Sequence, residues 1–469
     1  MNKPRIPMQE DPEWISLYSK RDAIHPRAVH GRFQRLRDVT VWATLGGYLL
    51  LPWLQWSDGD GGWRQAVLFD LPGRQFHIFG VTFWPQDFIL LSWLLIALAF
   101  ALFLVTVLAG RVYCGYVCPQ TTWTRFFTWI EKMTEGDRHA RIRLDKSPWH
   151  RKKIMKRGSK HILWWMLASL TGITFVGYFT PIGDLLFRAF TWELGRWEII
   201  WIAFFTGATY INAGWLREQV CIYMCPYARF QSVMFDRNTL IVSYDTARGE
   251  PRKRGRRTRQ NEGIGDCIDC ELCVQVCPTG IDIREGLQYE CIGCAACVDA
   301  CDAVMKQVDL PVGLIRYTTE NALRGRPTDW LRPRLLSYGA MLLIMVSVLG
   351  YALLTRVPLG IDVMRDRGQL YRTDSSGMIE NSYQLVVMNR SQQTRDIRLS
   401  LDAMDGVQWQ YGDQRVTLPA GATRTLPVTL AYDPYTDQVS TGPVWFILED
   451  QNNVRYRLRR ESRFIAPAH

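Results

Sequence analysis

Two similar cysteine runs lie close together in the chain, and their spacing decides the fold of the segment around them. The first run is Cys267-Ile-Asp-Cys270-Glu-Leu-Cys273-Val-Gln-Val-Cys277-Pro278 and the second is Cys291-Ile-Gly-Cys294-Ala-Ala-Cys297-Val-Asp-Ala-Cys301. In both runs the first three cysteines recur at every third residue, and the fourth follows four residues later. Three thiolates at this spacing can surround one metal cluster, while the fourth is free to reach a second one.

This spacing is typical of bacterial proteins that bind two [4Fe–4S] clusters, in which the fourth cysteine of each run binds the other cluster. The first predicted ligand set is Cys267, Cys270, Cys273 and Cys301, and the second set is Cys291, Cys294, Cys297 and Cys277. Zinc sites use four ligands in two pairs, which does not fit two interlocked runs of four. Asp302 stands where the usual pattern has proline, but all eight ligands are present. We therefore predict an electron-transfer segment rather than a substrate pocket.

The chain has 469 residues, of which 48% are apolar and 12 are cysteine, a composition that excludes a disordered, collagen-like, coiled-coil or small disulfide-stapled protein. Five stretches of 18 to 22 residues contain no Asp, Glu, Lys or Arg, and a helix of that length crosses a bilayer. They are Val39–Trp56, Phe88–Ala109, Ile162–Phe179, Ile199–Leu216 and Leu335–Leu354. We therefore expect a five-helix transmembrane bundle.

Lysine and arginine alternate between the segments that separate these spans. Residues 1–38 carry eight, 57–87 two, 110–161 thirteen, 180–198 two and 217–334 seventeen. Basic residues mark cytoplasmic segments, so we expect a multi-pass protein with a cytoplasmic N-terminus and an external, in a bacterium periplasmic, C-terminal part. The cysteine runs then lie on the reducing side, where disulfides are disfavoured. The net charge of +11 reflects this asymmetry and attraction to anionic lipid, and no nucleic-acid recognition motif accompanies it.

Five parts are expected along the chain. They are a cytoplasmic tail (1–38), a membrane domain with four spans (39–240), a cytoplasmic two-cluster ferredoxin-like α+β insert (241–334), a fifth transmembrane helix (335–354) and an external domain (355–469). The external domain contains short segments rich in β-branched and aromatic residues, separated by Asn, Gly, Asp and Pro. They include Ser382–Met388, Asp396–Leu401, Arg424–Leu430 and Gly442–Leu448. This pattern predicts an all-β immunoglobulin-like sandwich with a docking or structural role.

Two further cysteine pairs follow the second and fourth spans. Cys114 and Cys118, like Cys221 and Cys225, form a C-x-x-x-C-P motif, a weak internal repeat. Cysteines four residues apart share one face of a helix, and thiolates are soft ligands for copper(I), zinc or iron–sulfur clusters. These residues leave several interpretations open: one four-thiolate site, two separate metal-binding pairs, a dithiol–disulfide couple, or buried structural thiols. We call them the four-cysteine group.

Three other residues are weaker candidates. Met224 could add a thioether ligand, although packing is the better interpretation. His161 could face the four-cysteine group or a quinone, but an interfacial role is favoured, and His77 is expected to be a polar surface residue. None of the five spans contains a histidine, which excludes intramembrane haem b with histidine ligands.

Several stretches of the chain carry a resemblance to a known family. They are Phe69–Phe88, Gly110–Gln120, Arg217–Asp236, Cys267–Arg284 and Gly313–Thr319. Together with the β-rich C-terminal part, they resemble the CcoG/FixG/RdxA family, the bacterial cytochrome c oxidase accessory proteins. The twin cluster motif alone is shared by many redox proteins, but its combination with two C-x-x-x-C-P pairs and this C-terminal domain is specific.

The resemblance implies a role in assembling the cbb-type haem–copper oxidase of the bacterial inner membrane. Family members are thought to reduce copper(II) to copper(I) for the oxidase, which would make the chain a cupric reductase. On this implication the two clusters carry electrons, and Cys114, Cys118, Cys221 and Cys225 face copper, unless they hold a third cluster or nothing. The implied partners are oxidase subunits or assembly factors, a copper chaperone or transporter, an unidentified cytoplasmic electron donor, and membrane lipid. A quinol-linked electron-transfer ferredoxin and a non-enzymatic assembly scaffold remain alternatives.

Overall fold

The computed structural model describes residues 24–57, 62–253, 263–366, 368–391, 393–433, 441–451 and 456–466. They form two compact units, each built from separate stretches of chain. The first takes in residues up to Val41, Val105–Trp164 and Asn212–Asp329, and the second takes in Trp42–Leu104, Trp165–Ile211 and residues from Trp330 onward. The insert therefore shares a unit with residues 110–161, which follow the second expected span.

The first unit combines helices with one small pair of strands. Its elements, some of which continue into the second unit, are α1 (Arg32–Leu50), α2 (Phe88–Ala109), α3 (Val112–Tyr116), α4 (Pro119–Glu135), α5 (Arg138–Lys146), α6 (Arg151–Gly177), the π-helical turns η3 (Tyr210–Leu216) and η4 (Val220–Met224), α9 (Pro226–Met234), β6 (Ile241–Tyr244), α10 (Thr246–Gly249), α11 (Leu272–Gln275), η5 (Ile283–Glu285), α12 (Ala296–Gln307), β7 (Ile315–Thr318) and α13 (Glu320–Leu323).

The insert is closed by a strand pair at its two ends. β6 and β7 pair antiparallel, with Ile241 opposite Thr318 and Tyr244 opposite Ile315. Helix α12 and the cysteine runs pack against these strands around buried Val298 and other apolar side chains. This arrangement gives the expected α+β insert and brings both cysteine runs into one small core.

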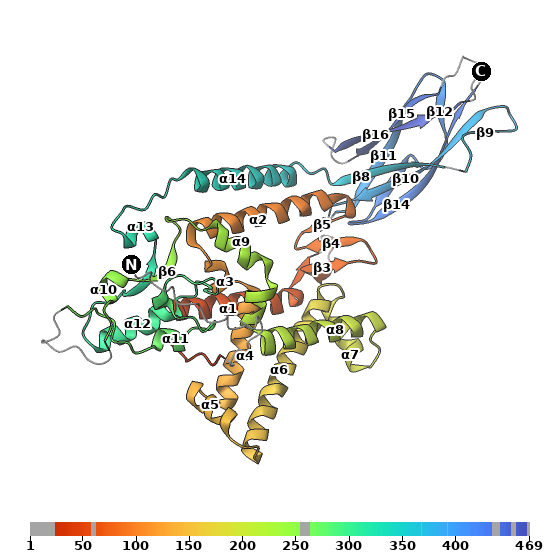
Figure 1. Ribbon diagram of the computed structural model, residues 1–469. Helices are drawn as coiled ribbons and strands as arrows, with labels where there is room; N and C mark the ends of the chain where they lie inside the picture. Colours follow the sequence, from red (N-terminus) through yellow and green to blue (C-terminus); the bar gives the residue numbers. More distant parts are fainter. Residues whose placement is uncertain are drawn as a thin grey trace, which may run out of the picture. The chain divides into compact units, whose positions relative to one another are not determined.

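The second unit contains the remaining helices and most of the strands (Figure 1). Its further elements are η1 (Leu51–Trp53), β1 (Gln55–Ser57), β2 (Trp63–Gln65), β3 (Val67–Asp70), β4 (Gln75–Ile78), β5 (Val81–Phe83), η2 (Pro85–Asp87), α7 (Ile182–Phe190), α8 (Arg196–Thr209), α14 (Pro333–Leu354), β8 (Leu359–Arg365), β9 (Arg372–Thr373), β10 (Ile379–Asn389), β11 (Arg395–Asp402), β12 (Val407–Tyr411), β13 (Arg415–Leu418), β14 (Thr423–Tyr432), β15 (Gly442–Asp450) and β16 (Arg457–Phe464).

Three helical stretches in the described residues have the length and apolar composition to cross a membrane: Phe88–Ala109, Arg196–Leu216 and Pro333–Leu354. They correspond to the second, fourth and fifth expected spans and make a membrane protein plausible. In the first expected span, α1 ends at Leu50, before Pro52 in the turn η1. The third expected span lies in α6, which begins with a strongly basic stretch. The five-helix bundle therefore stays a prediction.

Two of these helices pack side by side in the second unit. The indole Nε1 of Trp93 on α2 donates a hydrogen bond to the Met345 carbonyl on α14, 2.9 Å away. Asp87, just before α2, pairs with Arg356, just after α14, at 2.5 Å. The start of α2 thus lies beside the end of α14, so the two helices run antiparallel.

The C-terminal strands form two antiparallel sheets, drawn in blue in Figure 1. One sheet has the order β12-β14-β10-β8, with β9 pairing to β10, and the other has the order β13-β11-β15-β16. Alternate residues of the strands are buried in a shared core that includes Leu385, Val428 and Phe446. The four strands expected from the sequence lie within β10, β11, β14 and β15. The predicted β-sandwich is therefore confirmed.

Candidate metal centres

The two cysteine runs adopt the same backbone conformation, as expected of a repeat. In the first run, Asp269 and Glu271 flank the second cysteine and have φ values of 51° and 55°. In the second run, Gly293 and Ala295 flank the second cysteine with φ values of 64° and 55°. Left-handed backbone is costly for residues other than glycine, so three such residues indicate loops held tightly in one shape. The two runs therefore form matched loops.

The first ligand set lines one cavity. Cys267, Cys270, Cys273 and Cys301 all border it, together with apolar side chains that include Leu272, Val304, Met305 and Leu314. Cys270 is the one exposed cysteine in the described part of the chain. The cavity therefore collects the four thiols that the spacing assigns to one cluster, with one edge near the protein surface.

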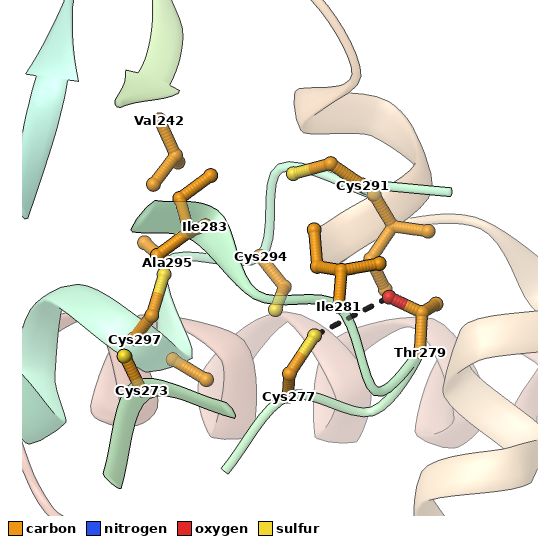
Figure 2. A pocket seen from close by; sticks show the side chains of 12 residues that line it. Val242, Cys273, Cys277, Thr279, Ile281, Ile283, Cys291, Cys294, Ala295 and Cys297 are labelled. Carbon is orange, nitrogen blue, oxygen red and sulfur yellow. Dashed lines mark hydrogen bonds between the residues drawn. The ribbon is translucent and has the colours of Figure 1, made fainter. Parts of the chain in front are cut away.

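The second ligand set lines a separate cavity, shown in Figure 2. Cys277, Cys291, Cys294 and Cys297 border it, and Cys273 also lines it, beside Cys297 in Figure 2. The Cys277 sulfur lies 3.3 Å from the Thr279 hydroxyl, the contact drawn as a dashed line in Figure 2. Cys273 borders both cavities, so the two cluster positions are neighbours within the insert.

The residues around both cavities fit [4Fe–4S] clusters. Each cavity offers four thiols in a largely apolar wall, and thiolates are the ligands that such clusters use. In the described residues, no three His, Cys, Asp or Glu side chains are close enough to hold a single metal ion. A cubane binds each thiolate through a different iron, so its ligands stand apart around the cluster. When bound, these clusters supply one-electron transfer.

Burial favours the protonated form of three thiols of the insert. It raises the pKa of Cys273, Cys291 and Cys301 to about 12 each. Cluster ligands must be thiolates, so cluster binding has to displace these protons, and the clusters then become part of the folded structure.

The four-cysteine group lies where short helices meet. Cys114 is in α3, and Cys118 immediately precedes α4; Cys221 is in η4, and Cys225 immediately precedes α9. The proline after each motif is the first residue of the next helix, where its missing N–H costs nothing. Each C-x-x-x-C-P motif therefore marks a break between two helices.

These four cysteines are electrostatic neighbours. The pKa of the Cys114 thiol is raised to about 12, mainly by burial, and the other three cysteines of the group add to the increase. Burial is also the main cause that raises the pKa of Cys221 to about 12, with further contributions from Cys118 and Cys225. Charge interactions of this kind weaken with distance, so the structure brings the two motifs together.

A polar network joins the two motifs, which are about one hundred residues apart in the chain. The Gln120 amide, directly after the first motif, donates to the carbonyls of Asn212 at 2.9 Å and Arg217 at 3.1 Å. The Arg217 guanidinium in turn pairs with Glu131 on α4 at 2.6 Å. Buried Glu131 also pairs with Arg141 at 3.0 Å. These contacts fix the approach to the second motif against the helix that follows the first.

Sequence reasoning missed Arg111, which lies between the two cysteine systems. Its buried guanidinium donates to the Tyr289 carbonyl at 2.6 Å and to the Ala228 carbonyl. Its charge acts to lower the pKa values of Cys114 and Cys291, opposing the larger effect of burial. The sequence feature that could have pointed to Arg111 is its position as a single arginine between an uncharged expected span and the first cysteine pair.

The weaker candidates lie in varied surroundings. His161 stacks on Trp215 with ring centroids 6.1 Å apart, and Met224 is exposed. His77 was expected at the surface, but this expectation is wrong: it is only 6% exposed, with Nδ1 3.0 Å from the Thr82 hydroxyl. Pairing of β4 with β5 turns His77 toward Thr82 and buries it.

Comparison with family models identifies three regions. Residues 91–154 match a 4Fe-4S binding domain, and residues 216–320 match a 4Fe-4S dicluster domain. Residues 349–467 match the immunoglobulin-like fold at the C-terminus of FixG. The first two matches support iron–sulfur binding and an electron-transfer type of protein, and the third confirms the predicted immunoglobulin-like domain.

Curated relatives match nearly the full length. The chain is 37% identical over 452 residues to the nitrogen fixation protein FixG of Rhizobium meliloti, covering 88% of this chain and 86% of the relative. It is 41% identical to RdxA and to RdxB of Cereibacter sphaeroides, covering 87% and 88% of this chain and 88% and 90% of those proteins. A crystal structure of a FixG-related protein from Vibrio parahaemolyticus matches 24% of this chain at 35% identity, with a TM-score of 0.22. The chain belongs to the FixG/RdxA family.

Proposed function

We propose that this protein is a membrane-bound iron–sulfur protein that reduces copper(II) to copper(I). In each turnover one electron from a cytoplasmic one-electron donor converts one copper(II) ion, the substrate, to copper(I). The step forms no lasting covalent bond and needs no general acid or base. Such an electron-transfer step is consistent with a chain whose clearest functional motifs are cysteine motifs.

The observation that carries the proposal is the placement of both cysteine systems in one compact unit. The four-cysteine group and the eight cysteines of the insert all belong to the first unit. The thiols of the two C-x-x-x-C-P motifs affect one another's pKa, which indicates that the motifs lie close together. The four-cysteine group lies in the same unit as the electron-transfer insert. An electron acceptor that binds to soft ligands such as thiolates could therefore be reduced there.

Copper fits this group because its reduced state prefers thiolates. Cys114, Cys118, Cys221 and Cys225 would bind the copper that receives the electron. In the described part of the chain no three such side chains are already close enough to hold one ion, so we propose that the four thiols gather around copper as it binds. The copper(I) formed would pass to a copper chaperone or transporter, and from there to a cbb-type oxidase under assembly.

The proposed location is the bacterial inner membrane, with the insert in the cytoplasm and the C-terminal sandwich in the periplasm. The distribution of Lys and Arg supports this orientation, because the basic segments include the insert. The antiparallel packing of α2 and α14 is consistent with it, since the segment before α2 and the sandwich then lie on the same side. We propose that the sandwich docks oxidase subunits or assembly factors there.

A second candidate follows from the match of residues 91–154 to a 4Fe-4S binding domain. That match includes Cys114 and Cys118, so the four-cysteine group could hold a third cluster. The protein would then be a quinol-linked electron carrier, and copper would not be its immediate acceptor.

Metal analysis after anaerobic purification separates the two candidates. About eight irons and eight sulfides per chain, from two four-iron clusters, would leave the four-cysteine group free for copper. About twelve irons would place a third cluster there. Reduced protein would then be mixed anaerobically with copper(II) and a chelator that colours with copper(I). Failure to form copper(I), with rapid oxidation of a quinol analogue by the oxidised protein, would overturn the proposal in favour of the quinol-linked carrier.

A further inference from the structure

Helix α3, which carries Cys114, lies directly against the loop of the second ligand set. A Cβ atom on Gly115 would stand 2.8 Å from the Cα of Cys294 and 2.9 Å from the Ile292 carbonyl oxygen. A Cβ on Gly293 would stand 3.2 Å from the carbonyl carbon of Arg111. The atoms that these Cβ atoms would meet belong to the backbone and cannot rotate away. Helix α3 and the loop of the second ligand set are therefore in close backbone contact, with a glycine on each side.

Side chains also pack across this junction between α3 and the insert. Cys114 packs against an apolar cluster formed by Cys294, Ile292 and three other buried residues of the insert. Arg111 spans the junction, since it donates to the Tyr289 carbonyl near the second ligand set and to the Ala228 carbonyl on α9, after the second motif. Its guanidinium also lies 5.0 Å from the centre of the Tyr289 ring. One buried cation therefore contacts segments of both cysteine systems.

The first ligand set is placed differently. Its Cys270 is exposed, and Arg284 beside it pairs with Asp269 and Asp282 at the edge of the insert. Its cavity is lined by residues of the insert, whereas the α3 junction lies at the second set. The insert thus has one cluster position that faces outward and one that abuts the four-cysteine group.

We propose that electrons enter at the first ligand set and leave through the second, and that Gly115 and Arg111 are positioning residues for this exit. The inference rests on the proposed function, since it needs an electron acceptor at the four-cysteine group. One electron arrives from the cytoplasmic donor and one reduces copper(II) to copper(I), so the insert returns to its starting state.

Each positioning residue has a physical task. Gly115 allows backbone contact between α3 and Cys294, which keeps the path short, and electron-transfer rates fall steeply with distance. Of the two ligand sets, Arg111 places its fixed positive charge beside the second, where it stabilises the more negative, reduced form of a cluster. The potential at the exit is then held higher than it would be without the charge, which favours electron flow toward it.

The distance requirement is tested with Gly115→Ala and a matched control, Gly158→Ala, because a Cβ at Gly158 in α6 meets no atom within 4 Å. Reduced protein is mixed with copper(II) in a stopped-flow instrument, and reoxidation of the clusters is followed by visible absorption. We expect Gly115→Ala to retain its iron and to reoxidise several-fold more slowly, while Gly158→Ala matches the unmodified chain. Equal rates in both variants would overturn the inference.

The charge requirement is tested without copper, so that it stands apart from the proposed function. Arg111→Gln removes the charge, and Arg111→Lys keeps it; EPR redox titration measures the midpoint potential of each cluster. Cys270→Ser, which disrupts the first set, identifies the signal of the second. We expect Arg111→Gln to lower the potential of the second cluster alone and Arg111→Lys to change it less. A shift at the first cluster, or at neither, would overturn the inference, whether or not the protein reduces copper and whether or not Gly115→Ala folds.

Discussion

The two cysteine systems differ in how their positions are specified. The eight cysteines of the insert lie within 35 residues, and local backbone turns place them around two cavities. The four-cysteine group is assembled from two distant motifs, and a network through Gln120, Glu131 and Arg217 joins them. The comparison shows that short spacing can encode a rigid cluster site, whereas a site shared between distant helices depends on tertiary contacts.

This difference also suits the two proposed tasks. A resident cluster benefits from closed loops, because every ligand is already placed around it. A substrate ion must bind and leave, so ligands that are close but not preset for one ion are adequate. Both cysteine systems lie in one compact unit.

The largest expected effect is the loss of a cluster. Cys294→Ser removes one ligand of the second set, and we expect iron per chain to fall by about half, since each set holds one four-iron cluster. Cys118→Ser is the matched change in the four-cysteine group and should leave the iron content unchanged. Iron and sulfide analysis after anaerobic purification measures both. A similar loss of iron in Cys118→Ser would show that the four-cysteine group also holds iron, which contradicts the proposed difference between the two systems.

The next effect separates electron storage from copper reduction. In the double variant Cys114→Ser with Cys221→Ser, one thiol of each motif is lost, and we expect copper(I) formation to fall to the level without protein. The clusters of the insert should still form and accept electrons from dithionite. Cys270→Ser provides the converse control, because it should lose a cluster while keeping the four-cysteine group. Unchanged copper(I) formation in the double variant would show that copper is reduced elsewhere.

The sequence predicted the insert well because its information is local. Cysteine spacing predicted the eight thiols that line the two cavities. The β-sandwich was also predictable, because alternating apolar residues form the faces that pack together. Three of the five expected spans coincide with helices of suitable length and composition.

The sequence could not show what tertiary packing decides. Nothing in the cysteine spacing indicates that Gly115 contacts the Cys294 backbone or that Arg111 reaches Ala228. His77 was misplaced because its position between two expected spans does not reveal the strand pair that buries it against Thr82. The first expected span was defined by its lack of charged residues and therefore included Pro52 and the residues after it. In the structure, α1 ends at Leu50.

The network that joins the two motifs should contribute more to stability than a surface ion pair. Burial alone would raise the pKa of Glu131, but Arg217, Lys160 and Arg141 outweigh it and hold the pKa below its ordinary value. Glu131→Gln leaves Arg141 and Arg217 without this carboxylate, whereas Lys160 keeps its pair with Glu135 at 2.9 Å. The loss should cost about 3–5 kcal/mol. Glu320→Gln removes an exposed pair with Arg324 and should cost less than about 1 kcal/mol.

Denaturation in mild detergent, followed by near-ultraviolet circular dichroism, compares these two variants. Trp164 is a suitable reporter, since Arg217 lies 5.5 Å from the centre of its ring. We also expect Glu131→Gln to lose copper reduction before it loses iron, because the two motifs separate while the local cluster loops persist. Equal stability of the two variants would show that other contacts hold the four-cysteine group together.

The smallest expected effect concerns the attachment of the insert to the start of α1. Asp299, between two cysteines of the second run, accepts hydrogen bonds from the backbone N–H groups of Phe33 at 3.3 Å and Gln34 at 2.7 Å. It thus supplies, from a distant part of the chain, the acceptor that a helix N-terminus normally finds in its own cap residue. Asp299→Ala should destabilise the first unit by about 1 kcal/mol, the usual value of such a cap.

Asp299→Asn keeps an acceptor oxygen and should restore most of this stability, while Glu285→Ala, at an exposed position, should change little. The readout is thermal loss of the visible absorption of the clusters under anaerobic conditions. Because Asp299 lies two residues from Cys297 and Cys301, a loss of iron at low temperature would indicate a direct effect on the cluster loops. A lower thermal midpoint with full iron content would instead show that contact with α1 stabilises the insert as a whole.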